Sequence, residues 1–187
     1  MHKLYKALTL SLLCAFVCNS VLGQDSDVAS HTITLNLEGT ALLGISTGDV
    51  SLQIDGVTEA GASLNAVAEN AETRLRISSL AETGVSRKIS AKMSKELIGT
   101  QLSIQALPPE TTNFTGDAGT YSDKTILTTT DNEIITNIGT CWSGIGDNDG
   151  YVIKYFYQIK DITPGGDAES IQGSTTVTVT YTLTDAS

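Results

Sequence analysis

The stretch Gly173-Ser-Thr-Thr-Val-Thr-Val-Thr-Tyr-Thr-Leu-Thr-Asp-Ala-Ser187 decides the fold of this chain. From Thr176 to Thr184, threonines alternate with apolar residues, so the two kinds fall on opposite sides of an extended chain. A period of two, carried largely by β-branched residues, is typical of a strand with one buried face. A terminal strand this regular predicts a sheet with a core on one side. Its apolar face consists of Val177, Val179, Tyr181 and Leu183.

Short segments of similar pattern recur along the rest of the chain, separated by turn-forming residues. The segment 151–160 is the most aromatic, and it also carries Val152 and Phe156 on its second face. The segment 59–72 has Leu64 and Ala68 at helical spacing and is expected to be a short helix or a loop. With about nine or ten short strands and turn signals between them, we predict an all-β, single antiparallel two-layer sandwich of the immunoglobulin-like or pilin-like kind. Besides the closing strand, strands are expected at 31–37, 41–45, 50–54, 73–79, 87–93, 101–106, 124–130, 133–140 and 151–160.

The first 23 residues have the features of a secretory signal peptide. A short basic region is followed by an apolar run from Ala7 to Val17, and Val21-Leu22-Gly23 ends the segment. The run is shorter than the roughly 20 apolar residues that a spanning helix needs. Cleavage after Gly23 is expected, with residues 24–187 as one secreted or cell-surface domain. A lipoprotein alternative would use Cys14 or Cys18, but neither follows the small residue expected at that position.

Removal of the signal peptide changes the charge and cysteine counts. Without Lys3 and Lys6, nine basic residues face 21 acidic ones, a net charge of −12. Such an acidic chain is expected to bind neither nucleic acid nor anionic lipid, and no other apolar run is long enough to span a membrane. Cys141 is the single remaining cysteine, so stability must come from an apolar core and not from an internal disulfide.

The signal peptide, the all-β body and the closing strand together resemble secreted bacterial pilin-like proteins. The nearest families are fimbrial major subunits of the MatB kind and spore-coat-U proteins. The last strand is also similar to the end of the WxL wall-binding domain. However, Ser143 and Gly144 follow Trp142, so the Trp-x-Leu signature is absent and wall binding is not implied. The resemblance implies an exported surface sandwich and carries no catalytic residue.

No catalytic pattern or cofactor motif stands out in the mature chain. His31 is its only histidine, and no local motif pairs it with Cys141. We therefore expect a non-enzymatic surface protein with a structural or adhesive role, of which a fimbrial-type subunit is one form. Gln24 to Leu37 is a candidate strand for donation to a neighbouring copy. The alternative is that Ile33, Leu35 and Leu37 pair within their own sheet.

The loop 141–151 is the candidate ligand site. An exposed Trp142 surrounded by Asp147, Asn148 and Asp149 would suit a sugar, which makes a carbohydrate-binding module the alternative function. The run Asp147-Asn148-Asp149-Gly150 offers oxygens of the kind that calcium prefers, but it lacks the spacing of an EF-hand. Because Asp-Gly also suits a tight turn, no metal site is predicted there.

Basic residues gather in a short part of this acidic chain. Arg74 and Arg76 share the outer side of one predicted strand, as Lys88 and Lys92 do on the next. If a hairpin through 80–86 joins these strands, four cations lie on one exposed face. Nearby acidic residues would neutralise them on a solvated surface. The sharper hypothesis is a docking face for a surface polysaccharide or for the acidic face of another copy.

Overall fold

The computed structural model describes residues 32–35, 37, 39–46, 48–56, 58–62, 66–160 and 173–186. The signal peptide, His31 and the segment 161–172 lie outside the described residues. The chain divides into two units, residues 1–37 and 38–187. In the first unit, 32–35 and 37 belong to no strand, and the apolar side chains of Ile33, Leu35 and Leu37 are exposed. The strand expected at 31–37 is therefore not formed at these positions.

The second unit is all-β, and its described residues contain no helix. Two antiparallel sheets pack against each other in an open sandwich, which confirms the predicted fold class. Sheet A consists of β1 (Thr40–Ile45), β2 (Val67–Leu80), β4 (Thr100–Leu107), β5 (Thr115–Gly116), β7 (Thr125–Ile126), β9 (Cys141–Trp142) and β10 (Tyr151–Ile159). Sheet B consists of β3 (Arg87–Met93), β6 (Thr120–Tyr121), β8 (Asn132–Ile138) and β11 (Val179–Asp185).

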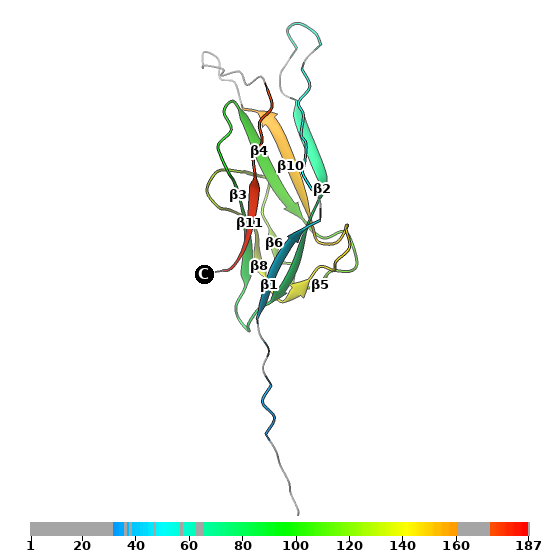
Figure 1. Cartoon of the computed structure of the whole chain (residues 1–187), viewed down its shortest axis with the longest axis vertical. Helices are drawn as coiled ribbons and strands as arrows, with labels where there is room; N and C mark the ends of the chain where they lie inside the picture. The colour runs from blue at the N-terminus through cyan, green and yellow to red at the C-terminus, as the bar shows by residue number, and fades with distance from the viewer. Residues whose placement is uncertain are drawn as a thin grey trace, which may run out of the picture. The chain divides into compact units, whose positions relative to one another are not determined.

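In sheet A, the order is β5-β9-β2-β10-β4-β7, and β1 pairs with the opposite edge of β2. In sheet B, the order is β11-β3-β8-β6. Figure 1 shows β10 between β4 and β2, and the terminal strand β11 beside β3. Consecutive strands β2 and β3 thus belong to different sheets. The hairpin on which a common basic face depended does not form, because residues 81–86 carry the chain from one layer to the other.

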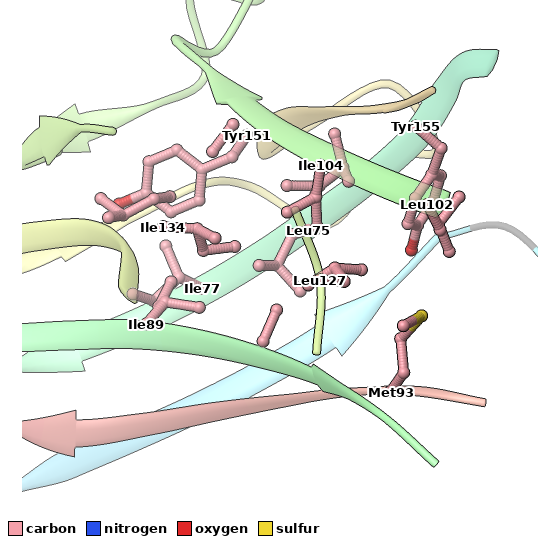
Figure 2. Close-up of a cluster of buried hydrophobic side chains, with 14 of the residues drawn as sticks. Leu75, Ile77, Ile89, Met93, Leu102, Ile104, Leu127, Ile134, Tyr151 and Tyr155 are labelled. Carbon is pink, nitrogen blue, oxygen red and sulfur yellow. The ribbon is translucent and has the colours of Figure 1, made fainter. Parts of the chain in front are cut away.

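The core lies between the inward faces of the two sheets. Figure 2 shows side chains of sheet A, including Leu75 and Ile104, pointing toward Ile89 and Met93 of sheet B. Their alternation follows from the pleat, which turns every second side chain of a strand inward. Val152 and Phe156 are also buried, on the outer face of β10, so both faces of this strand are covered as its sequence indicates.

The described residues of the segment 59–72 form no helix; its first part contains a turn and its last part is a strand. Val67 to Ala71 form the first part of β2, where the register with β10 shifts between Ile153 and Tyr155. A β-bulge moves the inward set of side chains by one residue, so the alternation changes phase. The strand expected at 50–54 is not formed, and the one at 124–130 is reduced to β7.

Candidate functional site

The candidate loop joins two strands that lie on the same edge of β2. β9 pairs with Ser78 and Ser79, β10 pairs with Val67 to Leu75, and residues 143–150 form the excursion between them. Ser143 anchors the start of the loop, because its N–H donates to the Ile77 carbonyl and its hydroxyl accepts the Ile77 N–H, both at 3.0 Å. At the end of the loop, a Cβ on Gly150 would lie 2.4 Å from the Leu75 carbonyl oxygen, so only glycine fits this close approach.

Asp149 holds the loop together from inside. It is only 4 % exposed, and its Oδ1 accepts hydrogen bonds from Asn113 Nδ2 at 3.0 Å and Thr111 Oγ1 at 2.8 Å. Its Oδ2 accepts the Gly146 N–H at 2.8 Å. The Asn113 hydrogen bond, then those from Gly146 and Thr111, lower the pKa of this carboxyl. Asp149 is therefore a structural acceptor whose two oxygens are already engaged, and it is not available to a sugar.

The same contacts explain the turn at Asp147 to Gly150. The Asp149 N–H donates to the Gly146 carbonyl at 3.0 Å, which closes a tight turn around Asp147 and Asn148. Asp147 and Asn148 are exposed on this turn. Within the described part of the chain, no three His, Cys, Asp or Glu side chains are grouped so as to hold a metal ion.

The pleat of β9 turns Trp142 to the outer face of the sheet, away from the buried residues next to it. Cys141 points into the core, whereas the indole of Trp142 points outward from sheet A and is 52 % exposed. The register places Trp142 directly between Ser78 of β2 and Thr115 of β5. Leu42 of β1 lies on the far side of Ser78 and is 63 % exposed. The neighbours of the indole along this row are thus hydroxyl-bearing residues and not the expected carboxylates of the loop.

Cys141 is a buried core residue. Burial raises the pKa of its thiol to about 11, so the thiolate is disfavoured. Burial also raises the pKa of Tyr151, whose hydroxyl donates to the Ala118 carbonyl at 3.1 Å. The Tyr151 ring packs against Phe114 and Tyr121, with ring centroids 5.4 and 6.0 Å apart. This environment gives Cys141 no nucleophilic role, since the thiolate is the reactive form.

The four basic residues expected on one face are divided between two. Arg74 and Arg76 lie on the outer side of β2 in sheet A, while Lys88 and Lys92 lie on β3 in sheet B. The outer faces of two packed sheets point in opposite directions, so the predicted common docking face does not exist. The alternation of the sequence correctly placed Arg74 with Arg76, and Lys88 with Lys92, on one side of a strand. It could not show which strands pair with each other, because that depends on residues distant in the chain.

Each of these four cations also has a partner within the molecule. Arg74 pairs with Glu110 at 2.9 Å, and Arg76 Nη1 donates to the Ile145 carbonyl at 2.7 Å. On sheet B, Lys88 pairs with Glu133 at 2.7 Å and Lys92 with Asp131 at 3.4 Å. Lys88, Glu133 and Asp131 help to line a shallow hollow of about 330 Å³, together with Ser90, Thr182 and Thr184. Both signs of charge line this hollow, so it gives no strong preference for an anion.

Two features of the surface were not evident in the sequence. Arg87, at the start of β3, donates to the Thr40 carbonyl of β1 and pairs with Asp185 of β11 at 3.1 Å. It therefore ties both sheets together at one end of the core. The second feature is the row of Thr115, Trp142, Ser78 and Leu42 across four strands. Alternation identifies which side each residue takes, but only the register reveals that these four are neighbours.

Comparison of the chain with protein-family models, with curated proteins and with solved structures finds no match in any of the three. Among the described residues, no helix has the length and apolar content needed to cross a bilayer. The site must therefore be interpreted from its own geometry.

Proposed function

We propose that this chain is an exported structural subunit of a cell-surface polymer, of fimbrial type, and that it has no catalytic activity. The observation that carries the proposal is the segment at 32–37. Its apolar residues Ile33, Leu35 and Leu37 alternate as in a strand with one buried face, yet they are exposed and belong to no strand. An alternating apolar segment without a sheet is suited to pair with the edge of another molecule.

The second unit offers an edge of the right kind. β11 ends the order of sheet B and pairs only with β3 among the described strands. The Ser94 N–H donates to the Thr178 carbonyl and the Ala186 N–H to the Ser86 carbonyl. By the alternation of an antiparallel ladder, even-numbered residues of β11 face β3, and the N–H groups of Val179, Tyr181 and Leu183 face the free edge. Unpaired edge groups of this kind are a template for another chain.

Export is supported by the sequence of residues 1–23, with a basic region, an apolar run and a small residue before the cleavage point. A structural role is supported by the buried carboxylate of the loop and by three cations of the basic strands, because they make contacts within the molecule. Asp149, Arg74, Lys88 and Lys92 all have protein partners. We accordingly assign the polymer contact to residues 24–37 of one copy and β11 of the next.

The experiment uses the mature chain, residues 24–187, and measures its assembly by light scattering and electron microscopy. Ile33→Asp with Leu35→Asp should abolish assembly, whereas Thr32→Asp with Thr34→Asp adds equal charge on the polar side and should preserve it. Deletion of 24–37 should leave a folded, monomeric domain. On the edge, Val179→Pro removes an N–H that faces away from β3 and should block assembly, while Val179→Ala should not.

A wild-type chain that remains monomeric under all conditions would refute the proposal. Assembly that survives both the Ile33→Asp, Leu35→Asp variant and Val179→Pro would refute the assigned contact. Global unfolding after deletion of 24–37 would instead mean that this segment belongs to its own sheet.

A further inference from the structure

The outer face of sheet A carries a row of side chains with a regular chemical pattern. Across β5, β9, β2 and β1 the register aligns Thr115, Trp142, Ser78 and Leu42, all of which point away from the core. Directly opposite side chains in a sheet have Cβ atoms about 5 Å apart, so each member contacts the next. Trp142 and Leu42 are the two large exposed apolar groups of the row. The small Ser78 lies between them and adds a hydroxyl to the row.

Polar groups of this row are free to bind a ligand. Within the described part of the protein, the Ser78 hydroxyl, the Thr115 hydroxyl and the Trp142 indole N–H have no hydrogen-bond partner. Two hydroxyls on neighbouring strands thus flank the exposed indole, which adds an N–H of its own. A binding site for a small polar molecule has this composition: an apolar surface for contact and a few placed polar groups for orientation.

The platform under the indole is fixed by its neighbours. A Cβ on Gly116 would lie 2.1 Å from the Thr140 carbonyl oxygen, so β5 lies unusually close to the chain at the start of β9. On the other side, Ser143 continues the ladder with Ile77. Cys141 is buried directly beneath. The backbone that carries the indole is therefore held in place before any ligand arrives, which reduces the entropy that binding must overcome.

We propose that this row is a binding site for a neutral saccharide, with the sugar ring stacked on the Trp142 indole. The C–H face of a pyranose carries partial positive charge and packs against the negative π face of an aromatic ring. Its ring hydroxyls can then pair with the free hydroxyls of Ser78 and Thr115. A surface on which apolar and hydroxyl groups alternate matches a ligand whose own surface alternates in the same way.

Two observations favour a neutral sugar over other occupants. A second protein copy would require a contiguous apolar patch, but Ser78 separates the Leu42 and Trp142 side chains. A polyanion would be repelled, because the mature chain has a net charge of −12. The site is separate from the assembly contact proposed above and does not depend on it.

The chain contains a single tryptophan, so its fluorescence reports on this site alone. The mature chain is titrated with a panel of soluble neutral oligosaccharides of glucose, galactose, mannose and N-acetylglucosamine. We expect a saturable change in emission with at least one member, with the same affinity at low and high salt. Calorimetry with that oligosaccharide should show at least about ten-fold weaker binding for Trp142→Ala, which corresponds to about 1.4 kcal/mol.

Further variants test whether binding depends on the row around Trp142 or on any exposed side chain of sheet A. Ser78→Ala and Thr115→Val remove single hydroxyls and should each weaken binding, whereas Trp142→Phe should retain part of it. Ile126→Ala is the matched control, because Ile126 is 51 % exposed on another two-residue strand of sheet A and should leave binding unchanged. The assembly-deficient Ile33→Asp, Leu35→Asp variant should bind the sugar normally, so the two proposals can fail separately.

No emission change with any neutral oligosaccharide would overturn the saccharide site. Binding that persists in Trp142→Ala, or that occurs only with acidic polysaccharides and weakens with salt, would also overturn it. Loss of assembly in Trp142→Ala would show that this face contacts another copy and would equally contradict the proposal.

Discussion

The hydroxyl of Tyr155 on β10 lies 2.5 Å from the hydroxyl of Tyr181 on β11, which makes a hydrogen bond between the two sheets. Because β11 is an edge strand with one partner, this bond is a second attachment for the end of the chain. Either oxygen can be the donor. Both tyrosines pack within or against the apolar core, so the bond is shielded from water.

Removal of one of these hydroxyls should destabilise the protein, because the other is left buried without its partner. Tyr155→Phe or Tyr181→Phe should each lower the free energy of unfolding by about 1–2 kcal/mol. The double variant should lose less than the sum of the single losses. Tyr157→Phe is the control on the same strand, since its hydroxyl has no partner among the described residues. Urea denaturation measures all four, and strictly additive losses would contradict the coupling.

The same pair should make the protein sensitive to alkali. Burial raises the pKa of both Tyr155 and Tyr181 above the ordinary value of 10.0. A raised pKa means that the unfolded chain loses these protons first, so the stability is complete below about pH 10 and decreases above it. The urea midpoint of the wild type should therefore begin to decrease at about pH 10 and continue to decrease as the pH rises further. In the Tyr155→Phe, Tyr181→Phe variant, the urea midpoint should depend less on pH in this range. The same pH dependence as in the wild type would contradict the role of the two tyrosines.

Asp149 should have the opposite pH dependence. Hydrogen bonds from Asn113, Gly146 and Thr111 lower its pKa, so its contribution is present above the ordinary value of 3.8 and is lost as the pH falls below it. Asp149→Asn should lower the urea midpoint at pH 7, because an amide cannot accept all three bonds. The difference from the wild type should shrink toward about pH 3. Asp147→Asn, on the exposed turn, is the control and should change the urea midpoint little. If the difference between the wild type and Asp149→Asn persisted in acid, the role assigned to the Asp149 carboxylate would be contradicted.

Arg87 should matter more to stability than its neighbour Lys88. The Arg87 side chain is 12 % exposed and bridges Thr40 and Asp185 across the two sheets. Arg87→Gln should reduce the free energy of unfolding by about 1–3 kcal/mol, since it leaves a half-buried carbonyl unpaired. Lys88→Gln removes an exposed ion pair with Glu133 and should cost less than about 1 kcal/mol. Equal losses would mean that the bridge adds nothing to the sandwich.

The sequence by itself determined the fold class and the sidedness of its strands. Alternation in the closing stretch predicted β11 and its inward Val179, Tyr181 and Leu183, and the pattern of 151–160 predicted a strand covered on both faces. These are local properties, because the pleat alone assigns successive side chains to opposite sides. The side taken by Arg74 and Arg76, and by Lys88 and Lys92, was determined in the same way.

Tertiary structure alone decided which strands are neighbours. The passage of residues 81–86 between layers separated two pairs of cations that the sequence appeared to unite. The bulge in β2 shifts the alternation of its side chains by one residue, in a segment where the sequence suggested a short helix or a loop. Within one short loop, the fold buried Asp149 and left Trp142 exposed beside Ser78. Pairing between strands distant in the chain depends on the register of the whole sheet, and no local pattern of residues encodes it.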